Sequence, residues 1–551
     1  MWNDLGGKIK EILYGYVREA SISNSADEKK AEAFFLDYFG RQDYFRQNPQ
    51  YYGAYPMEND PYGRAAVWAM VKGEGPDTVV MIHHNDVVTV EDFKLLKDYA
   101  FNPDALEEKL WEIKDTFDAE AKADLESGDW LFGRGVCDMK GGGAIQMALL
   151  SEYASEEHAK GNFWGNVIVL GVPDEENLSA GMRSGVILLD QLKKQYGLTY
   201  KMMINSEPHQ RKKKEEGIFS FGSIGKMMPW VYVRGSLAHA GKVFEGLNPT
   251  NVMCEIVRRT EVNMDLSDVV GGEAAPPPTW LYLRENKLGY DVSMPLTITG
   301  CLSVLTLNQS PQTVMQKLRD ICGEAFKTVI GDMNRNYKRF RKATGQPDKE
   351  LPWKANVVDF GQLYEEAKSN YGDAFVQAYE REMAQLSEKV RCGQETLITA
   401  NFHLVDFVYD YIKDLSPRVV LGLCPPYYPG VANILRPDGA GQRLRELLHT
   451  YVREQFGQTY TGEHFYTGIS DLSYSGIENA QETADRLKES MPFFGGIYTL
   501  PLEEIRNISM PCVNIGPWGK DFHKLTERVY KVDLYERTPK ILDYAIRQIL
   551  Q

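Results

Sequence analysis

Short apolar runs alternate with helical patterns over the first 216 residues, and this alternation limits the possible folds more than any other feature. The helical patterns lie at 5–20, at 28–39 and from Gly142 onward to about 160. The strand-like runs lie at 65–71, 78–82 and 166–170. Strands that alternate with helices form a mainly parallel sheet with helices on both faces. We therefore expect an α/β fold, in which ligand sites lie at the carboxyl ends of the strands.

The pattern changes near Gly217. Strand-like and helical patterns then follow each other less regularly. The strand-like runs lie at 228–233, 296–307 and 418–423, and the helical patterns lie at 252–262 and from Pro311 onward. A chain of 551 residues is too long for one hydrophobic core. We predict a catalytic domain built from 1–216 and 426–551, with an α+β lid domain inserted at 217–425. A largely helical, highly charged segment at 331–414 enlarges this lid.

Charge and composition argue against several kinds of partner. The net charge of -15 leaves no basic field for nucleic acid, and the basic run 211–214 is followed at once by two glutamates, as in a solvated loop. Seven cysteines without a CxxC pair indicate neither a disulfide framework nor a thiolate zinc site. Neither a secretory signal pattern nor a run of about 18 apolar residues occurs. We expect a cytoplasmic protein that binds neither nucleic acid nor a membrane.

The segment HHNDVV, at 83–88, directly follows a strand-like run and supplies the first candidate ligand. Side chains two apart in an extended segment point the same way, so His84 and Asp86 share a side and His83 faces the other. A metal-bound imidazole usually donates its second N–H to a carboxylate or a carbonyl, and Asp86 fits that role. A histidine with a purely structural role is the alternative interpretation.

Candidate carboxylate ligands also follow strand-like runs or lie in a glycine turn further along the chain. Asp138 lies among glycines in GRGVCDMKGGG, Glu175 and Glu176 follow a strand-like run in PDEEN, and Glu207 closes another in MINSEP. Adjacent carboxylates repel each other unless a cation or a proton offsets their charge. The alternative role for Asp138 is a helix cap in a glycine turn, and the alternative for Glu175 and Glu176 is an exposed acidic turn. A second histidine, His523, stands in the late segment DFHK.

Two imidazoles and three carboxylates in one α/β domain suit Zn²⁺, Mn²⁺ or Co²⁺. One catalytic zinc needs fewer ligands, whereas two metals that share a bridging carboxylate use all five. Asp138 can bridge through its two oxygens. One of the adjacent glutamates would then bind metal while its neighbour moves protons.

The motifs occur in the order and approximate spacing of a known group of enzymes. HHNDVV, GRGVCDMKGG, PDEEN, NSEP, GSLAHAG…GLNP and DFHKLTERV together resemble the co-catalytic zinc peptidase family of aminoacylases, carboxypeptidase G-type enzymes, acetylornithine deacetylase and succinyl-diaminopimelate desuccinylase. The resemblance covers nearly all of 1–310 and 426–551. Within this family, the length and the added helical segment are most similar to the bacterial arginine-utilisation proteins.

The resemblance implies a zinc-exopeptidase-like fold that holds two divalent ions, most simply Zn²⁺ with Co²⁺ or Mn²⁺ as alternatives. His84 and Glu207 would hold one ion, and Glu176 and His523 the other. Asp138 would bridge them, and the peptide bond after it would be cis.

The resemblance also implies the remaining roles. Glu175 would be the general base that activates water and returns the proton to the leaving nitrogen, with Asp86 as a supporting catalytic residue. His239, in AHAG, would stabilise the oxyanion from the lid. Asn248, in GLNP, and Asn308 would contact the substrate.

Two departures from the family pattern bear on substrate and assembly. Relatives that bind a substrate's α-carboxylate often carry Asp-x-Arg before a proline, and this chain has Asn308 there, which lacks the bidentate charged fork of arginine. The substrate would then lack a free α-carboxylate or be held differently. The lid is also about twice the usual size, so it would either form a homodimer or imitate a partner within a monomer.

The function predicted from the sequence is the hydrolysis of an amide bond in a small N-acyl amino acid or peptide. The resemblance to the arginine-utilisation proteins implies a role in arginine or amino-acid catabolism. A two-metal aminopeptidase and a catalytically inactive metal-binding regulatory protein are the alternatives. A serine or cysteine hydrolase is disfavoured, because the chain has no GxSxG motif.

Overall fold

The computed structural model describes residues 4–155, 165–211, 213–287 and 289–550, and the chain forms two compact units. The first unit contains Met1–Ile224, Val431–Glu478 and Pro501–Gln551, and the second contains Gly225–Gly430 and Asn479–Leu500. Residues 479–500, predicted as part of the catalytic domain, therefore belong to the second unit. The chain leaves the first unit and returns to it twice.

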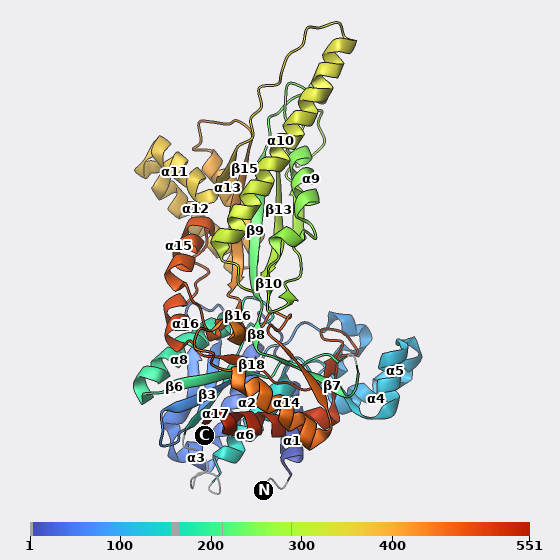
Figure 1. The fold of residues 1–551 in the computed structure, drawn as a ribbon, viewed down its shortest axis with the longest axis vertical. Helices are drawn as coiled ribbons and strands as arrows, with labels where there is room; N and C mark the ends of the chain where they lie inside the picture. The colour runs from blue at the N-terminus through green and yellow to red at the C-terminus, as the bar shows by residue number, and fades with distance from the viewer. Residues whose placement is uncertain (1–3, 156–164, 212, 288, 551) are drawn as a thin grey trace. The chain divides into compact units, whose positions relative to one another are not determined.

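A mixed eight-stranded sheet forms the centre of the first unit (Figure 1). Its strands follow the order β1 (Tyr52–Pro56), β2 (Ala65–Val71), β5 (Asn166–Val172), β3 (Asp77–His84), β6 (Thr199–Asn205), β18 (Cys512–Asn514), β7 (Glu216–Ser220) and β17 (Thr459–Glu463). The four central strands β5, β3, β6 and β18 are parallel, and β1 and β2 pair in antiparallel fashion at one edge. The predicted α/β class with a parallel central sheet is confirmed.

Helices cover the faces of this sheet, as its buried strands require. All seven residues of β2 and of β5 are buried, which needs cover on both sides. The main helices are α1 (Leu5–Arg18), α2 (Glu28–Gly40), α6 (Lys140–Tyr153), α8 (Ala180–Tyr196), α14 (Gln442–Phe456) and α17 (Thr538–Leu550). Every residue of α6 from Lys140 to Leu150 is buried, and the helix packs against α1, α17 and β3. Its predicted continuation toward 160 lies mostly outside the described residues.

A small three-stranded sheet joins the last part of the chain to the segment that carries Asp138. It pairs β19 (Gly519–Lys520), β20 (Arg528–Tyr530) and β4 (Trp130–Phe132), beside α4 (Pro103–Ile113) and α5 (Ala119–Ser127). The rings of Trp130, Trp518 and Tyr530 contact one another in edge-on or tilted arrangements, with centroids 4.6–5.3 Å apart. Because His523 lies between β19 and β20 and Asp138 follows β4, this pairing fixes both segments on one small scaffold.

The second unit is built on a five-stranded sheet. Its order is β12 (Thr279–Glu285), β13 (Thr297–Thr306), β9 (Gly225–Arg234), β15 (Arg418–Tyr428) and β14 (Val357–Asp359), and its helices are α9 (Pro249–Thr260), α10 (Pro311–Ala343), α11 (Phe360–Tyr371), α12 (Asp373–Arg391), α13 (Leu397–Tyr409) and α15 (Ala480–Ser490). The core surrounds Trp230, whose indole N–H donates to the carbonyl of Leu423 at 3.1 Å and whose ring contacts Phe360 and Phe402. The segment 331–414 is largely helical, as predicted, but the helices are interrupted at 344–356 and by β14. Within the described ranges, no helix, including the 33-residue α10, has the length and apolar character to cross a membrane.

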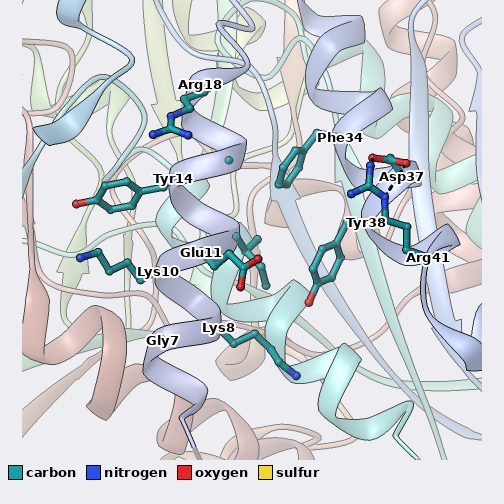
Figure 2. Close-up of a pocket in the computed structure, with 12 residues that line it drawn as sticks. Gly7, Lys8, Lys10, Glu11, Tyr14, Arg18, Phe34, Asp37, Tyr38 and Arg41 are labelled. Carbon is teal, nitrogen blue, oxygen red and sulfur yellow. Dashed lines mark hydrogen bonds and ion pairs between the residues drawn. The ribbon is translucent and has the colours of Figure 1, made fainter. Parts of the chain in front are cut away.

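A groove of about 660 Å³ runs between α1 and α2 in the first unit (Figure 2). Phe34 and Tyr38 line it together with several charged side chains. Three of these charges are already paired, because Arg41 bonds Asp37 and Lys8 bonds Glu152. None of the candidate site residues is among the described residues that line the groove. The groove is therefore distinct from the candidate site.

Close packing of α6 against the end of β6 generates a test of the fold. A Cβ atom at Gly142 would lie 2.2 Å from the carbonyl oxygen of Ser206, so Gly142→Ala must displace backbone next to Glu207. We expect a loss of roughly 1–3 kcal/mol in the free energy of unfolding, measured by urea denaturation.

The matched control is Gly331→Ala in α10, where a Cβ atom would meet nothing within 4 Å. Alanine is the better helix former, so this variant should keep its stability or gain up to roughly 1 kcal/mol. Equal unfolding midpoints for the two variants would show that Gly142 is not tightly packed.

Candidate metal centre

The carboxyl ends of three neighbouring parallel strands bring the candidate ligands to one edge of the central sheet. His84 is the last residue of β3 and pairs with Val172, the last residue of β5. Glu175 and Glu176 follow β5 by three and four residues, and Glu207 follows β6 by two. Since β5, β3 and β6 are adjacent, all these side chains start from the same edge, where α/β sheets place their sites.

Asp138 lies between the two histidines. Its Oδ1 is 3.1 Å from Nε2 of His84, and its Oδ2 is 3.1 Å from Nε2 of His523. Glu207 Oε1 lies 3.5 Å from the His84 nitrogen, and Glu176 Oε1 lies 3.0 Å from the His523 nitrogen. The His84 and Glu207 side chains form one group with Asp138, and the His523 and Glu176 side chains form another. The two groups therefore share the Asp138 carboxylate. Ligand atoms of His84, Asp138 and Glu176 lie within 4.8 Å of one another.

The two imidazoles differ in exposure. The side chain of His84 is 1% exposed and that of His523 is 50% exposed, so His523 forms the open side of the cluster. His523 and its neighbour Asp521 have positive φ angles of 63° and 55°, a region that few residues other than glycine adopt. The Asp521 carboxylate holds this turn, because it accepts hydrogen bonds from Lys524 Nζ at 3.0 Å and Thr526 Oγ1 at 2.9 Å.

The ring of His84 is oriented by its second nitrogen. Nδ1 lies 3.0 Å from the backbone carbonyl of Asp86, so a neutral imidazole donates there and turns the lone pair of Nε2 toward Asp138 and Glu207. The Asp86 carboxylate is 3.5 Å from the same nitrogen. It also accepts the backbone N–H groups of Glu175 at 3.1 Å and Glu176 at 3.2 Å. Asp86 thus connects both glutamates to the histidine.

His83 faces the interior, as its place in the strand predicts. Its Nε2 lies 3.2 Å from the hydroxyl of Tyr16 and its Nδ1 lies 3.0 Å from Gln146 Oε1. Gln146 in turn donates to the hydroxyl of Ser206 at 2.9 Å. Burial lowers the pKa of His83 to about 4, so this imidazole stays neutral beneath the cluster.

Glu527 fixes the loop that carries Asp138, a role that we did not predict although Glu527 lies within the motif DFHKLTERV. Its Oε1 accepts backbone N–H groups from Gly135, Cys137 and Asp138 at 2.8–3.3 Å. Its Oε2 accepts a hydrogen bond from Arg134 at 2.6 Å. The Asp138–Met139 peptide bond is cis, as the resemblance implied.

Two further side chains that we did not single out hold the backbone beside Glu207. The amide of Asn514 donates to the carbonyl of Glu207 at 2.8 Å. His209 lies 2.9 Å from the carbonyl of Gly516 through Nδ1 and accepts a hydrogen bond from Arg211 at 2.9 Å through Nε2. The contacts of Asn514 with Glu207 and of His209 with Gly516 join residues 307 positions apart, so no local sequence pattern indicates them.

The charge balance of the cluster suits divalent cations. Burial raises the pKa of Glu175 and of Glu207 well above the usual glutamate value, and neighbouring carboxylates add to the rise. Hydrogen bonds to Asp138 and Glu176 raise the pKa of His523 to about 10. Closely spaced carboxylates that repel one another, with imidazole nitrogens between them, are the donor set that hard and borderline divalent metals bind. The residues present therefore fit two such ions.

Three predicted residues, His239, Asn248 and Asn308, lie in the second unit. His239 accepts the N–H of Gly241 through Nδ1 at 3.0 Å, so its neutral ring carries the proton on the exposed Nε2. Asn248 caps α9 by accepting the N–H of Thr250 at 2.9 Å. Asn308 is exposed, and its backbone N–H donates to Asp268 at 2.6 Å.

Comparisons with known proteins identify the family of the chain. The model of Peptidase family M20/M25/M40 matches residues 103–547. Two proteins of Bacillus subtilis (strain 168) are similar over nearly the whole chain. The uncharacterized protein YqjN is 30% identical over 98% of this chain and 96% of its own, and protein RocB is 28% identical over 99% and 95%.

Solved structures share the fold at low sequence identity. Aminopeptidase PepT from Bacillus cereus ATCC 10987 has a TM-score of 0.52 and 11% identity over 99% of both chains. The metallo-carboxypeptidase Sso-CP2 from Sulfolobus solfataricus, described as an M20 family member, has a TM-score of 0.52 and 11% identity over 98% of this chain and 99% of its own. With the family model matched over most of its length, this chain belongs to Peptidase family M20/M25/M40, a family of metal-dependent enzymes that hydrolyse amide bonds.

Proposed function

We propose that the chain hydrolyses the amide bond of a small N-acyl amino acid or short peptide, with two divalent ions bound in the first unit. The position of Asp138 between two histidine–carboxylate pairs is the observation that carries this proposal. We assign His84, Glu207 and Asp138 to one ion, and Glu176, His523 and Asp138 to the other. Zn²⁺ is the proposed metal, with Co²⁺ and Mn²⁺ as alternatives.

Bound ions would supply Lewis acidity that lowers the pKa of a water molecule at this site. The rest of the chemistry falls to the side chains of the protein. Glu175 stands next to the ligand Glu176, and the N–H groups of both are held by Asp86. In this proposal Glu175 takes a proton from the attacking water and delivers it to the leaving nitrogen. His239 has its Nδ1 occupied by Gly241 and its Nε2–H exposed, which suits a donor to the carbonyl oxygen that becomes negative.

The substrate is proposed to lack a free α-carboxylate or to present it elsewhere. Asn308 occupies the position where family members often have arginine, and a neutral amide cannot replace a charged bidentate fork. The backbone N–H groups of Leu307, Asn308 and Gln309 are also taken, since all three donate to Asp268 at 2.6–2.9 Å. A role in arginine or amino-acid catabolism follows from the resemblance to the arginine-utilisation proteins and is part of this proposal.

Metal content tests the ligand assignment. We expect about two ions per chain by elemental analysis after re-supply with zinc, as for other two-metal sites. His523→Ala should retain about one ion and Asp138→Asn should lose most of both, because Asp138 serves both groups. His403→Ala, which removes an exposed histidine of the second unit, is the control and should keep two. Equal metal content in all variants would overturn the assignment.

Turnover tests the role of Glu175. On a panel of N-acyl amino acids, their amides and dipeptides, Glu175→Gln should keep both metals and lose kcat by roughly 10²–10⁴, the usual contribution of a general base. Chelation should abolish the activity of the wild type. Glu454→Gln changes an exposed glutamate of the same unit and should be unaffected. Unchanged kcat in a metal-loaded Glu175→Gln protein would remove Glu175 from the mechanism.

The same panel tests carboxylate recognition. We expect similar kcat/KM values for an N-acyl amino acid and for its α-amide, because Asn308 offers no charge to distinguish them. Asn308→Arg should shift the preference toward the acid by at least roughly tenfold, the value of one charge-assisted hydrogen bond. A strong preference of the wild type for the acid would contradict the substrate class proposed here.

A further inference from the structure

We propose that Arg64 and Glu28 are positioning residues for Glu175 and Glu176, so that the N-terminal segment sets the direction of the general base. This inference rests on the proposed function for its kinetic consequence. Both residues precede the part of the chain that the family model matches, which begins at residue 103. They act through the turn 174–176 and touch neither substrate nor metal in this proposal.

Three successive backbone N–H groups of this turn donate to buried carboxylates. The N–H of Asp174 donates to Glu28 Oε2 at 2.7 Å. The N–H groups of Glu175 and Glu176 donate to the two oxygens of Asp86 at 3.1 and 3.2 Å. Glu28 and Asp86 are both 0% exposed. Asp86 therefore holds both peptide planes that flank Glu175, and Glu28 holds the plane one residue earlier, before Asp174.

Arg64 connects Glu28 to the side chain of Asp174. Its Nη1 donates to Glu28 Oε1 at 2.6 Å and to Asp174 Oδ1 at 2.8 Å. Its Nε and Nη2 donate to Asp60 at 3.0 and 2.7 Å, which fixes the plane of the guanidinium. Arg64 is only 3% exposed, so water competes little for these bonds.

The turn needs this support because its backbone is strained. Asp174 has a φ of 70°, a conformation that costs a residue other than glycine of order 1–3 kcal/mol unless its surroundings impose it. The Oδ2 of Asp174 also accepts the N–H of Ala180 at the start of α8, at 3.2 Å. Removing Arg64 would leave Glu28 and Asp174 as facing buried acids, whose repulsion favours separation of α2 from the turn.

The direction of the Glu175 side chain follows from the backbone on either side of it. Catalytic groups lose rate steeply when they move, and a displacement of about 1 Å costs roughly 100-fold. Loss of the Arg64–Glu28 contact should therefore lower kcat through Glu175 while the metals stay bound. A purely structural role predicts only a lower melting temperature.

The variants are Arg64→Lys, Arg64→Met and Glu28→Gln, prepared as full-length, metal-loaded protein. Glu32→Gln is the matched control, because Glu32 lies one helical turn further along α2, is buried, and accepts the N–H of Ala65 without touching the turn. Arg41→Met is the second control, because Arg41 is an exposed residue directly after the C-terminal end of the same helix. Lysine lacks the planar fork and can restore only part of the network, so Arg64→Lys should be intermediate.

Two readouts are measured on each variant. Hydrogen–deuterium exchange of a peptide that covers 171–179 reports the N–H groups of the turn and requires no substrate. We expect faster exchange in Arg64→Met and in Glu28→Gln than in either control. Steady-state kinetics should show kcat lowered roughly 10- to 100-fold, KM changed less than about threefold, and two metals retained.

Exchange at wild-type rates in Arg64→Met and Glu28→Gln would overturn the inference, whatever the activity. Faster exchange with unchanged kcat in an active enzyme would also overturn it, because the turn would then not position the base. If the wild type cleaves no substrate, the proposed function fails, and the exchange experiment still decides whether Arg64 and Glu28 hold the turn. Arg64→Lys and Glu28→Gln change least and cover the case in which Arg64→Met does not fold.

Discussion

Repulsion between closely spaced carboxylates, half-buried or buried, is the constraint around which the first unit is organised. Asp138, Glu175, Glu176 and Glu207 converge where three parallel strands end. Two like charges about 4 Å apart repel by roughly 4 kcal/mol at an effective dielectric constant of about 20. The carboxylates therefore move apart unless cations hold them together. The ions that this family binds would supply the opposing charge, and the two imidazoles would supply further ligand atoms. Everything else near the site serves to keep these acids in place.

A second layer of acids holds the backbone of the first. Asp86, Glu28 and Glu527 each accept backbone N–H groups from the segments that carry the proposed ligands and the base. Two of these three are themselves neutralised by buried arginines, Arg64 beside Glu28 and Arg134 beside Glu527. The strained turn at 174 and the loop at 135–138 therefore share one design, in which a glutamate holds the backbone and an arginine holds the glutamate. Rigid supports of this kind give a site more precision than a free loop can.

The sequence was sufficient for the features that local patterns encode. The strands β2, β3 and β5, the helices α1 and α2, and the long helix from Pro311 were predicted within a few residues, because apolar periodicity determines them. The candidate donors could be named because each follows such a strand or a distinctive glycine turn. The roles of Glu527, Arg64 and Glu28 could not, since they depend on contacts between residues 36 to 393 positions apart. The return of 479–500 to the second unit was missed for the same reason.

The order of the chain has a consequence for its biosynthesis. His84, Asp138, Glu176 and Glu207 are all translated before the second unit begins, whereas His523 and Glu527 emerge from the ribosome after that unit is complete. A nascent chain therefore carries the crowded acids through most of its synthesis without the imidazole that faces Glu176 and without the glutamate that holds the Asp138 loop. The proposed centre closes only when the small β4–β19–β20 sheet pairs. The proposed site is thus incomplete until the final segment of the polypeptide has been made and docks.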